Sequence, residues 1–352
     1  MLPFKLVYSE GYYLPIGQHV FPGQKYRLVY QRLITSGLAE AADFIEPKPA
    51  TDKDILLVHT SEYVYKLQYG TLTAAEELQM EIPYSEELVD AFWLMAGGSI
   101  LAAERALQDG IAFNIGGGFH HAFPNHGEGF CMIHDVAVAI RRLQKDGRIK
   151  RAMTVDCDVH QGNGTAAIFG NRQAVQRQLP SFYGPTTPLK PKDGLNGPPA
   201  TNGSQENDVF TISLHQQYNY PTVKPPSSID VNLPDHTTDE QYLAWLDNAL
   251  SSGLRQFEPE LICYIAGADP YKEDQLGGLD LTIDGLKRRD ELVFKAARAK
   301  NIPVMVTYAG GYARRVEDTI TIHCNSIAAA KEIYLDRLAE EESSRVIDEH
   351  RS

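Results

Sequence analysis

The chain has 352 residues, with 33 Lys and Arg against 46 Asp and Glu, which gives a formal net charge of −13. Because a nucleic-acid-binding surface needs clustered basic side chains, this charge argues against direct binding to nucleic acid. The chain contains no apolar run of the roughly 18–20 residues that a membrane helix needs, and its first residues lack the pattern of a signal peptide. We therefore expect a globular protein that neither binds membranes nor is exported.

The four cysteines are far apart in the sequence and form no C-x-x-C pair: Cys131, Cys157, Cys263 and Cys324. Such spacing is typical of small buried thiols in a reducing compartment, rather than of disulfides or a thiolate zinc site. We expect a cytoplasmic protein, with nuclear residence left open if the host is eukaryotic.

Short apolar runs of strand length alternate along the chain with longer segments of helical spacing. The short runs predict strands at 5–8, 55–59, 112–115, 152–156, 209–214, 261–266 and 303–308. The longer segments predict helices at 26–36, 85–109, 134–145, 238–256, 283–300 and 313–334. This alternation favours a single α/β domain, with a central, mainly parallel sheet and helices on both faces.

Two segments differ from the rest of this domain, which we place at residues 1–335. Residues 171–208 are rich in proline and glycine and poor in apolar side chains, which predicts an irregular insertion. Because the next parallel strand must begin at the opposite edge of the sheet, we expect the insertion to lie away from the strands' carboxyl ends. Residues 336–352 are charged and predict a C-terminal tail.

Polar side chains follow four of the predicted strands, at the point where each strand ends. These segments are GGGFHH at 116–121, DCDVH at 156–160, GADP at 267–270 and AGGY at 309–312. In a sheet of this type, ligands bind beyond the carboxyl ends of the strands. The four segments therefore predict one site at a shared rim.

Alternate side chains of an extended segment point the same way, so Asp156, Asp158 and His160 share one side. Such groups repel one another when buried unless a cation holds them. The carboxylates of Asp158 and Asp269 with the imidazole of His160 predict a three-ligand divalent site with open positions, as in catalytic metal sites. Zinc, Fe²⁺ and Co²⁺ would all suit these donors. The alternative is that the acids only cap the helices that follow.

His120 and His121 follow three glycines, which let the backbone approach a ligand closely. A neutral imidazole can take a proton from water and return it to a leaving group. We expect Asp156 and Asn163 to fix the orientation of the two rings. The alternative is a pair of histidines that only pack. The glycines could also suggest dinucleotide binding, but His121 stands where that motif needs its third glycine.

Aromatic side chains complete the predicted site. Tyr312 follows two glycines, and beside a metal its hydroxyl would donate to a carbonyl oxygen as negative charge grows there. Phe130 and Tyr220 could line an apolar slot for a substrate, although both could equally pack in the core.

With these residues assembled, the chain resembles the zinc-dependent histone deacetylase family of the arginase/deacetylase superfamily. The matching segments are GGGFHHA, GFCMIHD, DCDVHQGNG, SLH, AGADPYKEDQLGGL and GGYARR. The resemblance covers about residues 5–327, and the forms DELVF and DCDVHQGNG are most similar to the class IV branch and its bacterial members. The insertion at 171–208 is absent from the family pattern.

The resemblance implies a role for each site residue. It implies zinc at Asp158, His160 and Asp269, a His120–Asp156 pair, His121 as general base and acid, and Tyr312 as the carbonyl polariser. Separately, we expect Gly129 to line the substrate channel together with Phe130 and Tyr220. The resemblance also implies a monovalent-cation site, usually for potassium, at Asp156, Asp158, Ser213 and the main chain of His160 and Leu214. Asn163, the partner of His121, stands where class I members have Asp, whereas class II and IV members share the Asn.

The function implied by the resemblance is metal-assisted hydrolysis of an N-acylated amine, with the acyl-lysine side chain of a peptide or protein as the expected substrate. Three alternatives stay open. The first is a deacetylase for acetylpolyamines. The second is a binuclear ureohydrolase of the same fold, which would need further Asp or His ligands at the rim. The third is a non-catalytic acyl-lysine reader, which should lack a zinc ligand, His121 or Tyr312.

Overall fold

A single parallel sheet forms the centre of the molecule in the computed structural model, which describes residues 1–170 and 208–349. The strand order is β2-β1-β3-β8-β7-β4-β5-β6, and every pairing between the described strands is parallel. The strands are β1 (Leu6–Val7), β2 (Phe44–Ile45), β3 (Ile111–Asn114), β4 (Ala152–Asp156), β5 (Val209–Gln216), β6 (Ile229–Leu233), β7 (Leu261–Ile265) and β8 (Val304–Thr307). The predicted α/β fold with a mainly parallel sheet is confirmed.

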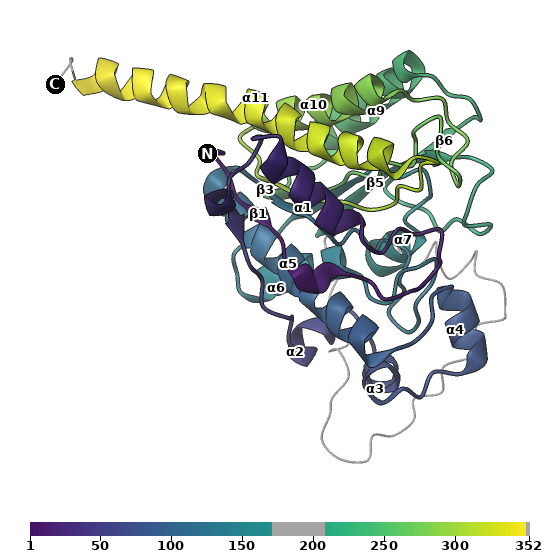
Figure 1. Cartoon of the computed structure of the whole chain (residues 1–352). Coiled ribbons are helices and arrows are strands. Elements are labelled where there is room, and N and C mark those ends of the chain that lie inside the picture. Colours follow the sequence, from purple (N-terminus) through teal and green to yellow (C-terminus); the bar gives the residue numbers. More distant parts are fainter. Residues whose placement is uncertain (171–207, 350–352) are drawn as a thin grey trace.

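Helices cover both faces of this sheet, and the six predicted ones are all present. They are α1 (Lys25–Thr35), α5 (Glu86–Asp109), α6 (Asp135–Lys145), α9 (Asp239–Gln256), α10 (Ile283–Ala299) and α11 (Val316–Glu349). On one face α10 packs against α9 and α11, and α11 packs against α1, whereas α5 and α6 pack together on the other (Figure 1). The segment expected as a tail continues α11 to Glu349, and this end of the helix projects beyond the rest of the chain (Figure 1).

Burial explains which strands the sequence could reveal. β3, β4, β5, β7 and β8 are buried along their whole length, as central parallel strands between two helix layers must be. They therefore appear as continuous apolar runs. The edge strand β6 alternates polar and apolar residues and is partly exposed, and β2 has only two residues. Neither β2 nor β6 was predicted.

The strand predicted at 55–59 is wrong. The chain there leaves the short helix α2 (Asp52–Ile55) and turns into α3 (Ser61–Tyr69). The Asp54 carboxylate accepts hydrogen bonds from the backbone N–H and the hydroxyl of Thr51, at 2.9 and 2.6 Å, which favours a helix start at this point. A short apolar run cannot be told from a buried helical turn by its periodicity alone.

A helix is also expected to open at residues 162–165, and α7 (Asn163–Phe169) begins there. Three further short elements were not predicted: α4 (Ala74–Met80) and the 3₁₀ turns Glu10–Tyr12 and Ala41–Asp43. Each is too short for a helical period to be recognised in the sequence.

The predicted insertion lies outside the described residues except for its last residue, Asp208. The backbone carbonyl of Asp208 accepts a hydrogen bond from the N–H of Ala152 at 3.0 Å, and its carboxylate pairs with Arg141 at 2.5 Å. Asp208 thus sits where β4 and β5 begin, at the edge of the sheet opposite the strands' carboxyl ends.

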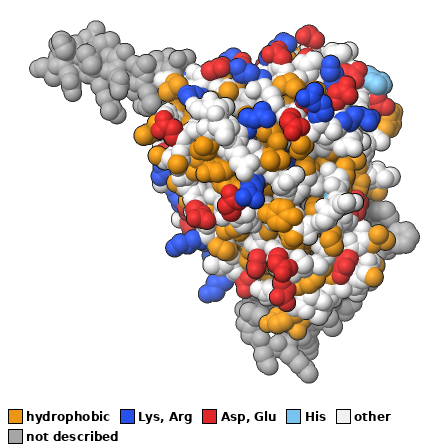
Figure 2. Space-filling model, in the orientation of Figure 1, with side chains coloured by type: hydrophobic (Ala, Val, Ile, Leu, Met, Phe, Trp, Pro, Cys, Tyr) orange, Lys and Arg blue, Asp and Glu red, His pale blue; other side chains and the backbone are white. Residues whose placement is uncertain are grey.

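The described surface mixes charges of both signs. Figure 2 shows Lys and Arg interspersed with Asp and Glu among apolar side chains on this face. Of the described helices, none combines the length and the apolar character needed to cross a membrane.

Fully buried imidazoles also occur outside the predicted site residues, among them His59, His134 and His323. Burial lowers the pKa of His59 to about 4 and holds the pKa values of His134 and His323 well below the ordinary value. His59 Nε2 accepts a hydrogen bond from the backbone N–H of His134 at 3.0 Å, which a protonated ring could not do. His323 stacks on Tyr308 at 4.1 Å between ring centroids, and neither of its ring nitrogens has a hydrogen-bond partner among the described residues.

We expect these rings to make the fold acid-sensitive. Below the ordinary imidazole pKa of about 6.5, the unfolded chain binds protons that the folded chain cannot bind, so the free energy of unfolding falls from there down to the folded-state pKa. At pH 5 each ring should cost about 2 kcal/mol. Denaturant unfolding of wild type and His323→Phe at pH 7.5 and 5.0 tests this, since the variant keeps a ring against Tyr308 but loses one titrating group. The difference between the two pH values should shrink in the variant, and an unchanged difference would contradict the expectation.

Candidate active site

The four segments predicted to form the site follow strands that are neighbours in the sheet. β3, β8, β7 and β4 lie side by side in that order, and their carboxyl ends meet at one edge. His120 and His121 follow β3, Tyr312 follows β8, Asp269 follows β7, and Asp158 follows β4. The topology therefore brings together side chains that are nearly two hundred residues apart in sequence.

Asp158, His160 and Asp269 form a buried group whose ligand atoms all lie within 4.8 Å of one another. His160 Nδ1 lies 3.1 Å from Asp158 Oδ1 and 3.4 Å from Asp269 Oδ2. The backbone N–H of Gly310 donates to Asp158 Oδ2 at 2.8 Å, and that of Val159 donates to Asp269 Oδ1 at 2.8 Å. The main chain thus holds both carboxylates in place.

Two features of this group suit a metal ion. Asp269 Oδ2 is buried and accepts no hydrogen bond from the described residues, so one carboxylate oxygen is left for another partner. Any side chain at Gly310 would collide with Asp269 Oδ2 and Asp158 Oδ2, and one at Gly267 would collide with Asp158. Glycine at these positions keeps open the space beside the two acids, and the O,N,O donors fit a divalent ion.

The charges in this group also favour a cation. Burial and the neighbouring Asp158 carboxylate raise the pKa of Asp269 to about 7. Burial alone would lower the pKa of His160, but its contacts with Asp158 and Asp269 outweigh burial and raise it to about 10. Without a metal the group thus gathers protons to offset its negative charge, and a divalent ion would take their place.

The structure also places each of the two histidines with a separate partner. His120 Nδ1 lies 2.6 Å from Asp156 Oδ2, and His121 Nδ1 lies 2.7 Å from Asn163 Oδ1. The two rings are adjacent, with centroids 4.1 Å apart, and both are buried.

Their different partners give the two imidazoles different charges. Burial lowers the pKa of His120, but Asp156 and Asp158 outweigh it and raise the value to about 9. Burial and the neighbouring charges of His120 and His160 hold the pKa of His121 well below the ordinary value. At neutral pH His121 is therefore the ring that can accept a proton.

Tyr312 faces the same group from the end of β8. Its ring centroid lies 6.4 Å from that of His160 and 6.0 Å from that of Phe130. Asp274 fixes its backbone by accepting from the Tyr312 N–H at 2.6 Å. Burial, followed by the charges of Asp269 and Asp158, raises the pKa of the Tyr312 phenol well above the ordinary value. The hydroxyl therefore stays protonated and can donate a hydrogen bond.

A hollow of about 180 Å³ opens onto these side chains. It is lined by Glu81, His121, Gly129, Phe130, His160, Asn219, Tyr220, Leu276 and Tyr312. The three residues predicted for a substrate channel, Gly129, Phe130 and Tyr220, are thus found beside His121 and Tyr312. The Tyr220 ring stands perpendicular to the His121 ring, with centroids 5.0 Å apart.

Ser213 and Leu214, predicted for a monovalent-cation site, lie on β5 next to β4. Ser213 pairs in register with Asp156, and its hydroxyl lies 2.9 Å from His215 Nδ1. Both residues are buried, and their strand β5 flanks β4 on one side while β7 flanks it on the other.

Two charged residues beside the site were not found from the sequence. Lys25 is fully buried, donates to the Ala309 carbonyl at 2.5 Å and lies 4.5 Å above the Phe21 ring. Glu128 accepts a hydrogen bond from Asn163 Nδ2 at 2.5 Å. Lys25 stands at the start of a helix far from every motif, and no pattern marks it. Glu128 lies between two quoted motifs, and a lone acid beside a Gly-Phe pair gives no signal of its own.

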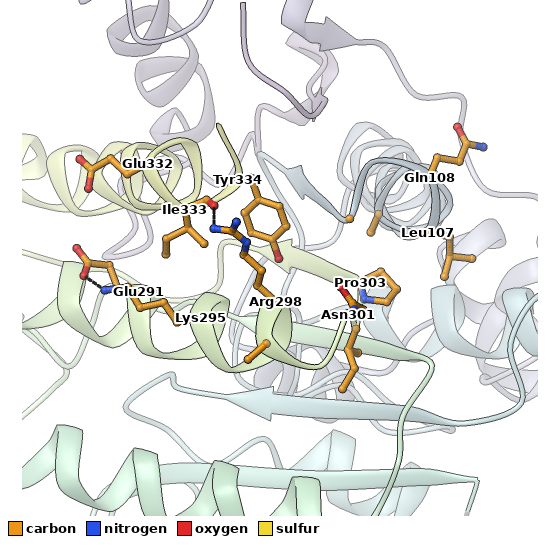
Figure 3. Close-up of a pocket in the computed structure, with 14 residues that line it drawn as sticks. Leu107, Gln108, Glu291, Lys295, Arg298, Asn301, Pro303, Glu332, Ile333 and Tyr334 are labelled. Carbon is orange, nitrogen blue, oxygen red and sulfur yellow. Dashed lines mark hydrogen bonds and ion pairs between the residues drawn. The ribbon is translucent and has the colours of Figure 1, made fainter. Parts of the chain in front are cut away.

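A larger hollow of about 910 Å³ lies at the opposite edge of the sheet, between α5, α10 and α11 (Figure 3). Its charged side chains already have partners: Lys295 donates to Glu291 at 2.8 Å, and Arg298 donates to the carbonyl of Ile333. The hollow adjoins Gly110 and Pro303, where β3 and β8 begin, and so lies away from Asp158, His160 and Asp269.

A family model described as the histone deacetylase domain matches residues 19–327. The chain belongs to the histone deacetylase family. This match confirms the family predicted from the sequence. The chain is a hydrolase of the deacetylase type and has the arginase/deacetylase fold.

Similar proteins occur in bacteria and plants. An uncharacterized protein of Picosynechococcus is 35% identical over 94% of this chain and 99% of its own length. Histone deacetylase 2 of Arabidopsis thaliana is 32% identical over 90% of this chain and 77% of its own length. The crystal structure of a histone deacetylase homologue in complex with SAHA has the same fold, with a TM-score of 0.71 at 23% identity, and covers 95% of this chain and 88% of that one.

The described metal-binding side chains at the rim give no support to the ureohydrolase alternative. A binuclear site would need a second set of Asp and His ligands at the rim. Among the described residues, Asp158, His160 and Asp269 are the only group of three or more such side chains that could hold a metal ion.

Proposed function

We propose that this deacetylase hydrolyses the amide bond of acyl-lysine side chains in peptides or proteins, with zinc held by Asp158, His160 and Asp269. The observation that carries the proposal is that the ligand His160 lines the same hollow as His121 and Tyr312. The ligand atoms of Asp158 and Asp269 lie within 4.8 Å of that of His160, and His120 and His121 each have a separate partner. Fe²⁺ or Co²⁺ would also suit the same donors. When bound there, a divalent ion would supply Lewis-acid polarisation of the acyl carbonyl and activation of water.

His121 is the residue that we propose moves the proton. Its low pKa keeps it neutral, so its ring can accept a proton from the attacking water and return one to the leaving amine. Asn163 holds the Nδ1 side of the ring at 2.7 Å. A protonated His120, paired with Asp156 at 2.6 Å, would favour negative charge on the reacting carbonyl.

Tyr312 is proposed as the donor to the acyl oxygen. Because its phenol keeps its proton, it can form a hydrogen bond that strengthens as the oxygen gains negative charge. Asp274 anchors its backbone and thus keeps the ring beside His160.

The walls of the hollow support an acyl-lysine substrate. Phe130, Tyr220 and Leu276 offer apolar surface to the uncharged methylene chain of such a side chain, and Gly129 leaves room for it. One observation favours acetylpolyamines as a second candidate class, since the Glu81 carboxylate also lines the hollow and could pair with a remote ammonium group.

Two further assignments complete the proposal. We place a monovalent cation, usually potassium in this family, at Asp156, Asp158, Ser213 and the main chain of His160 and Leu214. We also propose that the protein acts in the cytoplasm, which its four buried cysteines without disulfides support.

A hydrolysis panel tests the substrate class. Lysine peptides carrying acyl groups from acetyl to myristoyl, together with acetylpolyamines, are assayed with wild type and Glu81→Gln. We expect turnover of the peptides that chelation abolishes and added zinc restores. Glu81→Gln should leave their kcat/KM within about 2-fold, because the uncharged methylene chain of an acyl-lysine has no ammonium group to pair with the Glu81 carboxylate. A polyamine deacetylase would instead lose turnover of its cationic substrate in this variant. Undiminished hydrolysis after the metal has been removed would contradict the proposal.

A further inference from the structure

The side chain of Glu128 lies beside the site at only 13% exposure, in the loop that connects His121 to Phe130. Four donors from different segments surround its carboxylate. Oε1 accepts from Asn163 Nδ2 at 2.5 Å and from the Tyr220 hydroxyl at 2.9 Å. Oε2 accepts from Gln79 Nε2 at 3.2 Å and lies 3.3 Å from His126 Nε2. Although burial alone would raise the pKa of Glu128, these hydrogen bonds lower it below the ordinary value and keep the group ionised.

The contact with Asn163 matters because an amide can face two ways. Its oxygen end only accepts hydrogen bonds and its nitrogen end only donates them. Asn163 Oδ1 lies 2.7 Å from His121 Nδ1 and accepts from the backbone N–H of Gly164 at 3.1 Å. An ionised Glu128 accepts but cannot donate, so it can pair only with the nitrogen end. A reversed amide would oppose oxygen to carboxylate at one end and NH₂ to an N–H at the other.

The orientation of the amide in turn decides where the proton of His121 lies. With Asn163 Oδ1 facing it, Nδ1 must carry the hydrogen, so Nε2 has the free lone pair. A reversed amide would place a donor against Nδ1 and favour the opposite tautomer, which could not accept a proton at Nε2. An aspartate in place of Asn163 would need no such control, because both of its oxygens accept.

We propose that Glu128 is a positioning residue that holds Asn163 in the orientation required for His121 to act as a base. The proposal rests on the proposed role of His121 as general base. It assigns to Glu128 a task that arises because this chain has an amide, and not a carboxylate, next to His121.

Two variants separate hydrogen bonding from the bulk of the side chain. Glu128→Gln can still accept from Asn163 Nδ2 through its oxygen, whereas Glu128→Met has a similar length but no acceptor there. Loss of such an outer partner typically costs 10–100-fold in activity. We therefore expect kcat to fall about 10–100-fold in Glu128→Met and by less than about 3-fold in Glu128→Gln, with zinc content retained in both.

In an Asn163→Asp background we expect Glu128→Gln to have the opposite effect on kcat. In Asn163→Asp two carboxylates would face each other across the 2.5 Å contact, so Glu128 should hinder the reaction. Adding Glu128→Gln to Asn163→Asp should then raise kcat about 10-fold relative to Asn163→Asp alone, whereas the same change in wild type is neutral or harmful. A residue that only stabilises the loop would not give opposite signs in the two backgrounds when each variant is assayed at equal folded fraction.

Two controls test the contacts of Glu128 with Gln79 and Tyr220. Gln79→Ala removes an exposed donor from Oε2 and leaves the Asn163 contact intact, so kcat should stay near the wild-type value. Tyr220→Phe removes the other donor to Oε1 and is expected to change KM, because Tyr220 lines the hollow. If Tyr220→Phe reproduced the kcat loss of Glu128→Met, the carboxylate would act through Tyr220 and the proposal would be overturned.

An NMR measurement tests the proposal independently of any reaction. Long-range ¹H–¹⁵N spectra of ¹⁵N-histidine-labelled zinc protein, with the His121 signals identified from a His121→Gln sample, report which ring nitrogen carries the proton. We expect the Nδ1–H tautomer in wild type and Glu128→Gln, and a mixture or the Nε2–H form in Glu128→Met. An unchanged tautomer in Glu128→Met overturns the inference. A missing deacylase activity with the expected tautomers would refute the proposed function alone.

Discussion

Asp269→Asn should lose its bound metal and its hydrolytic activity together. The Val159 N–H donates to Asp269 Oδ1 and would hold the oxygen of the new amide in the same place. That leaves the NH₂ group where Asp269 Oδ2 now lies beside His160, and an amide NH₂ cannot ligate a cation. Replacing a residue that only hydrogen-bonds to a metal ligand typically lowers metal affinity or activity about 10–100-fold. Loss of this direct ligand should therefore lower kcat/KM by more than about 100-fold.

Elemental analysis and peptide hydrolysis measure the two losses of Asp269→Asn in the same sample. The fold should survive, because the variant replaces a buried carboxylate, one of whose oxygens accepts no hydrogen bond from the described residues, by an amide of the same size. Asp280→Asn is the matched control, since Asp280 is exposed and its carboxylate pairs with His236 on the surface. A metal content of about one ion per chain in Asp269→Asn, with activity near wild type, would show that the ligand set is wrong.

Tyr312→Phe should keep its bound metal but hydrolyse the substrate with a much lower kcat. The phenol is expected to act when the acyl oxygen becomes negatively charged, so its hydrogen bond belongs to the transition state rather than to the bound substrate. Removing one such donor costs about 10²–10³ in kcat, or about 2.7–4 kcal/mol. The phenylalanine ring would retain the contacts with Phe130 and Phe21, so KM and folding should change little.

Steady-state kinetics and the binding of a zinc-chelating hydroxamate distinguish the two variants. Tyr312→Phe should bind the hydroxamate with at most a modest loss, because the ligands of the metal are intact, whereas Asp269→Asn should not bind it. If Tyr312→Phe hydrolysed every cleavable substrate at the wild-type rate, Tyr312 would not be the donor to the acyl oxygen.

The sequence predicted the central strands and the site that follows them for one physical reason. Strands buried on both faces must be continuously apolar, and the polar residues directly after them stand out against that background. Asp158, His160, Asp269 and Tyr312 could be recognised in this way. The half-exposed edge strand β6 lacked such contrast, and the apolar run at 55–59 gave the wrong element because a buried helical turn has the same composition.

The places of Lys25 and Glu128 beside the site could not be predicted from the sequence. Lys25 meets the site only because α1 packs where β8 ends, and its partner Ala309 is 284 positions away. The partners of Glu128 come from several separate segments, which only the folded chain brings together. Neither contact follows from a motif or a period, since both depend on how distant elements pack.

The position of β8 has a consequence for how the site is made. Among the described strands, β8 is the last in the sequence, yet it lies between β3 and β7 and alone joins the β2-β1-β3 side of the sheet to the β7-β4-β5-β6 side. A ribosome-bound chain that has not yet released residues 304–307 would hold two separate three- and four-stranded pieces, with the histidines on one piece and all three metal ligands on the other. Assembly of the complete site is thus a late event in biosynthesis, and it depends on a sequence-distant pairing of the kind that makes folding slow.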